Sequence, residues 1–217
     1  MGYGIIIKNS NNEIQIDGQY RNYCFEQEGT AAFTSSAVVS ITSSPLIPLI
    51  LIRPELNKWG RAFKYAKDAD NFVSFGICTE EDVAASIDWK SYRETPNASG
   101  ETYGLRIYND SGLLVFDSGK SYFKIMQIND ITLTADGTSY TDISHPAVSN
   151  PFYLLTNWNL YIAYAGPTPY VHSFIYYIGV KPLTSTSVRV GWFYCGAIPA
   201  QVNQTQNPSF KLITCAL

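Results

Sequence analysis

The chain has 217 residues, of which 14% are aromatic and only 15% are charged, and its formal net charge is −3. This length provides one large or two small domains with a proper core. The acidic balance argues against a nucleic-acid partner, because phosphate binding relies on clustered Lys and Arg. The densest basic group, residues 61–67, has the alternation expected of the solvent face of a strand. The abundance of Tyr and Phe favours pleated, half-buried surfaces and indicates an all-β protein.

The first predicted element is a β-hairpin over residues 2–17, with a loop rich in Asn. Its first strand carries Ile5, Ile6 and Ile7 consecutively, which places apolar side chains on both faces. A two-stranded ribbon is only marginally stable alone, so this one must pack on a second surface. We expect these isoleucines to form a subunit contact. A strand enclosed within its own domain is the alternative.

The middle of the chain has the pattern of several short strands separated by turn residues. In the last of them Ala85, Ile87 and Trp89 share one face, as a half-buried strand requires. The most apolar run, residues 46–52, is too short to span a bilayer and is marked by prolines, so we expect a buried strand and no membrane insertion. The predicted strands are 37–42, 46–53, 61–67, 72–78 and 83–90, with a hairpin turn at 68–71.

The hairpin motif then returns over residues 103–117, after a polar linker at 95–100. Tyr3-Gly4 corresponds to Tyr103-Gly104, and both copies end a short apolar strand on an aspartate, Asp17 and Asp117. Those aspartates are expected to bond turn amides, and both copies to lie in sheets. Period-two alternation predicts burial of four side chains in the second copy: Leu105, Ile107, Leu114 and Phe116.

Further short strands follow to the end of the chain, and no long segment has helical periodicity. The predicted fold is an all-β antiparallel β-sandwich, either one extended sandwich or two adjoining ones. We divide the chain into β-rich halves at residues 1–95 and 96–217, each holding one hairpin, with one continuous domain as the alternative. The later predicted strands are 122–128, 131–134, 152–156, 160–164, 174–181, 187–194 and 209–214.

Residues able to carry chemistry are few and form no recognisable catalytic motif. Only two histidines are present; His172 precedes Ser173, but neighbours on a strand point to opposite faces, and His145 is expected on a surface turn. The carboxylates match neither a calcium loop nor a glycosidase motif. The cysteines are widely spaced, so we expect buried thiols without disulfides or zinc. The sequence therefore predicts no catalytic residues, no metal and no cofactor.

Four residues stand out as candidates for contact with a partner or receptor. Trp158 lies between Asn157 and Asn159 in a loop-like stretch, and Tyr170 lies between a proline and a valine. An aromatic ring offers stacking and the flanking amides offer hydrogen bonds, a combination suited to glycan or protein recognition. Trp89 and Trp192, by contrast, alternate with apolar neighbours and are expected in the core.

The two hairpin strings, together with the run 48–54 that ends in Arg-Pro, resemble sequences in a group of small tail proteins of tailed bacteriophages. The resemblance spans roughly the first 130 residues. It implies a virion structural protein rather than an enzyme, at the tail tip or as a fibre adaptor. Other phage tail proteins are the expected partners, with a homo-oligomer favoured by the low charge and closed tail symmetry.

Two other functions remain open. A receptor-binding module would contact a host-surface glycan or protein, and an envelope glycan-degrading enzyme would need converging carboxylates of perturbed pKa. The N-terminal residues lack the features of a signal peptide, so we expect synthesis in the host cytoplasm before incorporation into the virion.

Overall fold

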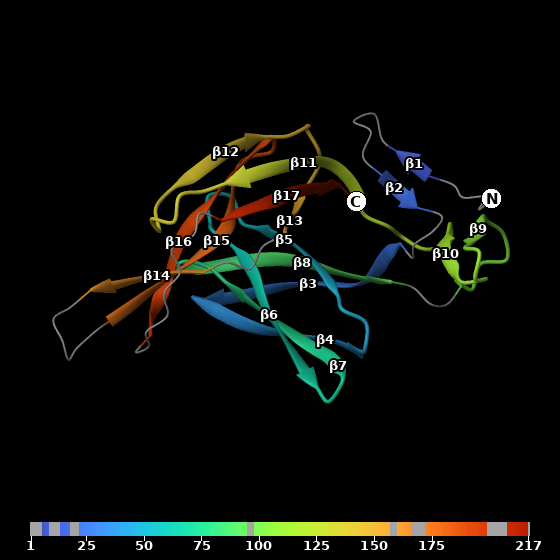
Figure 1. The fold of residues 1–217 in the computed structure, drawn as a ribbon, viewed down its shortest axis with the longest axis horizontal. Helices are drawn as coiled ribbons and strands as arrows, with labels where there is room; N and C mark the ends of the chain where they lie inside the picture. Colours follow the sequence, from blue (N-terminus) through green and yellow to red (C-terminus); the bar gives the residue numbers. More distant parts are fainter. Residues whose placement is uncertain are drawn as a thin grey trace.

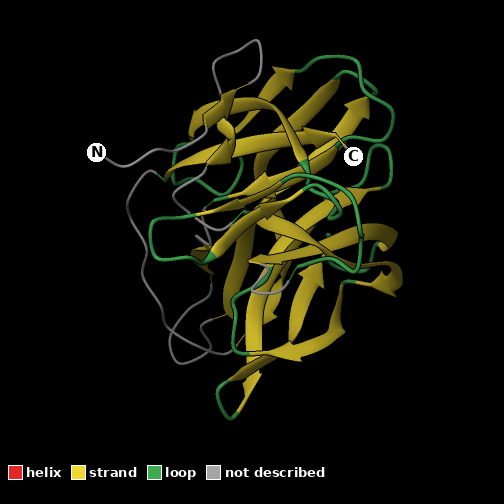
Figure 2. Ribbon diagram, turned by 90° about the vertical axis from the view of Figure 1, so that its right-hand side faces the viewer, coloured by secondary structure: helices red, strands yellow, loops and turns green. Residues whose placement is uncertain are grey.

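The protein is described by a computed structural model that covers seven stretches of chain. These are residues 6–8, 14–17, 22–94, 98–156, 160–165, 172–198 and 208–216. Within these stretches all regular elements are β-strands, as the strand-only ribbon of Figure 2 shows. The predicted all-β class is confirmed, and the strands pair antiparallel in several packed sheets.

Seventeen strands are described in chain order (Figure 1). Their bounds are β1 Ile6–Lys8, β2 Ile14–Asp17, β3 Tyr23–Thr34, β4 Ser36–Ser44, β5 Leu49–Pro54, β6 Arg61–Asp68, β7 Asn71–Cys78, β8 Ala84–Glu94, β9 Arg106–Tyr108, β10 Leu114–Asp117, β11 Lys124–Thr132, β12 Tyr140–Ser144, β13 Phe152–Leu155, β14 Leu160–Ala165, β15 His172–Thr184, β16 Ser187–Ile198 and β17 Ser209–Ala216.

Three larger sheets make up the body of the molecule. A six-stranded sheet has the order β11-β17-β13-β5-β8-β3 and thus takes strands from before and after residue 95. A four-stranded sheet, β12-β16-β15-β14, and a three-stranded sheet, β4-β7-β6, face it together. These two smaller sheets are joined by an antiparallel bridge in which the backbone N–H of Gly60 donates to the Val180 carbonyl over 2.8 Å, and the reverse bond measures 3.0 Å. We call them together the second layer.

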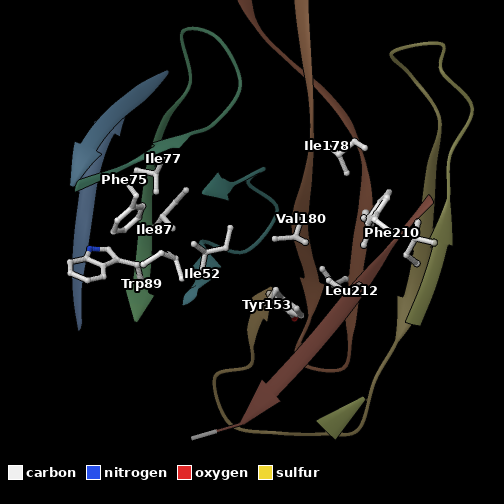
Figure 3. Packing of buried hydrophobic residues seen from close by; sticks show 14 of the residues in the cluster. Ile52, Phe75, Ile77, Ile87, Trp89, Tyr153, Ile178, Val180, Phe210 and Leu212 are labelled. Atoms are coloured by element: carbon white, nitrogen blue, oxygen red, sulfur yellow. The ribbon is translucent and has the colours of Figure 1, made fainter. Parts of the chain in front are cut away.

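The core lies between the six-stranded sheet and the second layer (Figure 3). Ile52 and Leu212 contribute from the six-stranded sheet, Phe75 from the three-stranded sheet and Val180 from the four-stranded sheet. Phe75, Val180 and Leu212 have no exposed surface. Burying one such side chain stabilises the fold by roughly 1.5–3 kcal/mol, so this shared cluster binds all three sheets.

The alternation predicted around Trp89 is present in β8. Ala85, Ile87 and Trp89 are buried, whereas Ser86 and Asp88 between them are partly exposed. The Trp89 ring packs edge-on against Phe75 at a centroid distance of 5.4 Å. Trp192 is also buried as expected, and its indole N–H donates to the Thr134 carbonyl over 2.7 Å. Both tryptophans therefore belong to the core, as predicted.

The turn predicted between residues 68 and 71 is confirmed. β6 ends at Asp68 and β7 begins at Asn71, and Ala69 in the turn has a φ of 51°. The sequence patterns did not predict β3 or β12. β3 lies at an edge of the six-stranded sheet. It carries Glu26 and Gln27 at half-buried positions and Thr30 and Thr34 at exposed ones, and its first half lacks a regular apolar alternation.

Two expectations about polar residues are wrong. His145 was expected on the surface but is only 6% exposed, because its ring nitrogens bond the Tyr153 hydroxyl and the Pro146 carbonyl, each over 3.0 Å. Arg61 was expected on a solvent face but is 2% exposed, with its guanidinium 4.8 Å from the centre of the Tyr177 ring. Both polar groups find partners in the interior, which is what makes their burial tolerable.

Candidate functional site: the two hairpins and a polar groove

The second hairpin, β9 with β10, is built by local hydrogen bonds in its loop. Asn109 accepts from the backbone N–H of Ser111 over 3.0 Å and of Leu113 over 2.9 Å through its side-chain oxygen. Gly112 has a φ of 74°, a conformation that favours glycine. Asn109 and Gly112 therefore close this turn.

Asp117 fixes the base of this hairpin. Its carboxylate accepts from the backbone N–H of Ser99 over 2.6 Å, from that of Gly119 over 2.8 Å and from the Arg106 guanidinium over 3.2 Å. The Ser99 amide contributes most to holding the pKa of Asp117 well below its usual range; burial opposes this, and the Gly119 amide, the Ser99 hydroxyl and Arg106 add to it. The expectation that this aspartate bonds turn amides is confirmed.

The second hairpin is also tied to the body of the molecule. Asn22, just before β3, donates to the Val115 carbonyl from its backbone N–H over 3.1 Å and from its side-chain amide over 2.7 Å. Phe116 stacks on Tyr122 at a centroid distance of 5.0 Å. Figure 1 draws both hairpins to one side of the stacked sheets. The anchoring contacts all involve β10, and β9 is its partner in a two-stranded sheet.

The first hairpin, β1 with β2, has the same register as the second. Ile6 pairs with Asp17 in the first, and one hundred residues later Arg106 pairs with Asp117 in the second. Each hairpin also has a register shift at the equivalent place, which leaves Val115 as the extra residue in the second. The repeat seen in the sequence is therefore a repeat of backbone structure, including its bulge.

Exposed apolar side chains gather on these two hairpins. Ile6 is 57% exposed and Ile7 41% exposed, so the two described members of the predicted contact are accessible in the isolated chain. Ile5 lies outside the described residues. The second hairpin and the residues beside it add Tyr103, Leu105, Tyr108 and Leu113. A gathering of exposed apolar side chains on short hairpins is typical of a surface that binds another protein.

Of the four side chains predicted to be buried in the second hairpin, Leu114 is buried, and Ile107 and Phe116 are half-buried. Leu105 is 51% exposed, so that prediction is wrong. Leu105 precedes the first residue of β9, and Gly104 before it has a φ of 143°, so the strand alternation does not extend to it. The remaining candidates, Asn157, Trp158, Asn159 and Tyr170, lie outside the described residues.

A groove with both polar and apolar walls lies beside β5 and β8 of the six-stranded sheet. Two hollows of about 490 and 540 Å³ share Arg53, Asp88 and Asn150 in their walls. Thr30 donates from its hydroxyl to Asp88 over 2.5 Å, and the Arg53 guanidinium forms an ion pair with the same carboxylate. The Arg53 guanidinium also lies 5.2 Å from the centre of the Phe152 ring. Both charged side chains are about one-third exposed.

The Asp88 carboxylate in this groove is held in its ionised form. Burial alone would raise the pKa of Asp88, but hydrogen bonds from Thr30 and Arg53 outweigh it and keep that pKa below its ordinary value. Glu28, at the edge of the groove, pairs with Lys90. The groove therefore presents an ionised carboxylate, a guanidinium and an amide, which suit hydrogen bonding to a polar ligand. A general acid of a glycosidase needs the opposite shift in pKa.

All four cysteines are thiols in the structure. Among the described residues, His, Cys, Asp and Glu side chains form no group of three or more that could hold a metal ion. The part of the chain that the structure describes contains no helix long and apolar enough to cross a membrane. No protein-family model, no curated protein and no solved structure matches this chain.

Proposed function

We propose that the protein is a virion structural protein of a tailed bacteriophage, located at the tail tip or acting as a fibre adaptor. The observation that carries the proposal is the gathering of exposed apolar side chains, including Ile6, Ile7 and Leu105, on two hairpins of matching register. Among the described residues each hairpin forms a sheet of only two strands, and another chain can extend such a sheet by strand addition.

The proposed partners are other tail proteins and further copies of this chain. A two-stranded ribbon has little stability alone. A neighbouring subunit would therefore stabilise the first hairpin by burying the Ile6 and Ile7 side chains, which are exposed in the isolated chain. A sheet-rich body joined by one core provides a rigid support for such contacts. The resemblance of both hairpin strings to small tail proteins points to the same role.

The test uses a tailed phage whose genome encodes this chain. Ile6→Ser combined with Ile7→Ser should give particles that lack the protein, measured by mass spectrometry of purified particles and by electron microscopy of tails. Val38→Ser is the matched control, because Val38 is 76% exposed on β4, away from both hairpins. Normal incorporation of the double variant, or absence of the unaltered chain from purified particles, would refute the proposal.

A second role, contact with a host-surface glycan, is favoured by the groove around Arg53 and Asp88. Its fixed donors and acceptors lie beside the apolar side chains of Pro54 and Leu56, a mixture that suits sugar hydroxyls and ring faces. Binding of the full chain to a glycan array, lost in Arg53→Met and retained in Arg189→Met, would support this role. Arg189 is a suitable control because it also pairs with an aspartate, Asp142, in a different sheet.

A further inference from the structure

Two cysteines that are far apart in the sequence meet on the outer face of the second layer. Cys78 is the last residue of β7 in the three-stranded sheet, and Cys195 lies in β16 of the four-stranded sheet. Each thiol shifts the pKa of the other, since the two side chains lie close together. They belong to a small apolar cluster with Trp59 and Phe193, whose rings stack at a centroid distance of 5.8 Å.

A β-bulge determines the position of Cys195. In the pairing of β15 with β16, Ile175 lies opposite Gly196 and Tyr176 opposite Tyr194, so Cys195 is the extra residue without a cross-strand partner. Gly196, the next residue, has a φ of 132°, a backbone conformation that favours glycine and that this bulge requires. Bulges commonly redirect a side chain next to functional sites.

The segment after β7 is held against this bulge by a backbone bond. Glu81 lies three residues after Cys78 in the sequence, and its backbone N–H donates to the Tyr194 carbonyl over 3.1 Å. Arg61 lies directly opposite Cys78 in the pairing of β6 with β7. The backbone therefore brings two thiols and a guanidinium together at the seam between two sheets.

The two thiols have different surroundings. Cys78 has no exposed surface, and burial is the main cause that raises its pKa well above the ordinary value. Cys195 is half-buried, and the hydrogen bond from Cys78 is the main cause that lowers its pKa; burial and the charge of Glu81 oppose this, and the charge of Arg61 supports it. Burial lowers the pKa of Arg61 to about 10, so it remains a cation at neutral pH.

We infer that Cys78 and Cys195 form a redox-active pair that closes to a disulfide on exposure to a peroxide, joining the two sheets of the second layer. The Cys195 thiolate attacks one peroxide oxygen and releases hydroxide, which is protonated to water, leaving a sulfenic acid on Cys195. The Cys78 thiol then attacks that sulfur and a second water leaves. In total two thiols are oxidised and one hydrogen peroxide is reduced to two waters.

The division of roles follows from position. The accessible thiol with the lowered pKa reacts first, because the thiolate is the nucleophile and only an accessible one meets the oxidant. The buried thiol packs in the same apolar cluster and acts as the resolving group. Cys24 and Cys215 provide the contrast within the same chain, since both are buried in other parts of the fold, and Cys215 belongs to a separate apolar cluster.

The test treats the purified full chain with hydrogen peroxide and then blocks remaining thiols with an alkylating reagent. Intact mass should fall by two hydrogens before alkylation, and peptide mapping should find a link between the peptides of Cys78 and Cys195. Cys24→Ser should leave this link unchanged. In Cys78→Ser the sulfenic acid on Cys195 should persist and be trapped by dimedone.

Three results would overturn the inference. These are an unchanged thiol count after peroxide treatment, a link that involves Cys24 or Cys215, and a link between chains in place of one within a chain. Peptide mapping of the unaltered protein needs no variant to fold, so the inference can fail even if the serine variants are unstable. A closed pair should also raise the urea midpoint of unfolding, and added dithiothreitol should reverse that rise.

Discussion

Asp117 accepts hydrogen bonds from both the backbone N–H and the hydroxyl of Ser99, which lies 18 residues earlier in the chain. The two bonds measure 2.6 and 3.0 Å. They close the segment before the second hairpin onto the end of β10. One aspartate thereby defines where the second hairpin begins and ends, and its ionised state is essential to that role.

Replacing Asp117 by Asn should loosen the second hairpin while the sandwich stays folded. The substitution removes the charge that the Ser99 and Gly119 amides and Arg106 stabilise, and hydrogen bonds to a charged group are worth about 2 kcal/mol. Hydrogen exchange should become faster in residues 99–119 and remain unchanged in β8. Asp110→Asn makes the same charge change at an exposed loop position and should have little effect. Equal rates of hydrogen exchange in residues 99–119 of the two variants would contradict this role of Asp117.

The same contact should make the second hairpin sensitive to acid. The pKa of Asp117 is lowered in the folded chain, chiefly by the Ser99 amide. Its stabilising contribution is therefore fully present above the ordinary aspartate pKa of about 4 and is lost as the pH falls through the lowered value. Limited proteolysis of the hairpin should increase in that acid range in the unaltered chain. In Asp117→Asn the hairpin should be cleaved equally at all pH values tested.

The sequence patterns predicted those parts of the fold in which local rules and tertiary packing agree. Period-two alternation placed Ile87 and Trp89 in the core, and the Asp68–Asn71 turn was correct because a tight hairpin depends on local residues. The repeated hairpin was also visible, since both copies keep the residues that form the same bulged register. In each case one short segment carries all the information.

The incorrect predictions depend on contacts between distant segments. Arg61 lies in a strand with the pattern of an exposed face, but it is buried beneath Tyr177 from a strand more than one hundred residues later. Leu105 is a different case: it has a strand-like sequence, but the local backbone at Gly104, with its φ of 143°, places it just outside β9. The meeting of Cys78 with Cys195 could not be predicted, because it depends on a bulge in β16 and on the seam between two sheets.

Glu26 should contribute more to stability than its neighbour Glu28. Glu26 is the extra residue of a bulge in β3, and it accepts from Arg93 over 2.6 Å and from the Ser91 hydroxyl over 2.9 Å. The Arg93 side chain is only 5% exposed, so Glu26→Gln leaves a buried cation without its counter-charge. The substitution should therefore lower the free energy of unfolding by about 3 kcal/mol. Urea unfolding measures this loss.

The control for that experiment is Glu28→Gln. Glu28 is 56% exposed and pairs with Lys90, so its loss should cost at most about 1 kcal/mol. Similar urea midpoints for the two variants would mean that Arg93 is satisfied without Glu26.

Gly179→Ala should destabilise the seam between the four-stranded and three-stranded sheets. A Cβ atom at this position would lie 2.5 Å from the Phe193 ring and 2.8 Å from the backbone oxygen of Gly60. The contact with the backbone oxygen cannot be relieved by a rotamer change, so the strands must move apart. This should lower the free energy of unfolding by about 2 kcal/mol. Gly100→Ala, where a Cβ would meet no atom within 4 Å, is the matched control. Thermal unfolding followed by near-UV circular dichroism, which reports on the nearby aromatic rings, is the measurement.

Phe75→Ala and Leu212→Ala should each lower the stability of the whole body in a single unfolding transition. Phe75 lies in the three-stranded sheet and Leu212 in the six-stranded sheet, yet both are fully buried in one cluster (Figure 3). Removing either side chain leaves a cavity and should cost roughly 2–5 kcal/mol. Because strands from both halves of the chain line this cluster, fluorescence and circular dichroism should give the same urea midpoint in both variants. Ile47→Ala, at a side chain that is 51% exposed, should leave that midpoint nearly unchanged. Two separate transitions in the Phe75 variant, with only one of them shifted, would show that the halves unfold as independent domains.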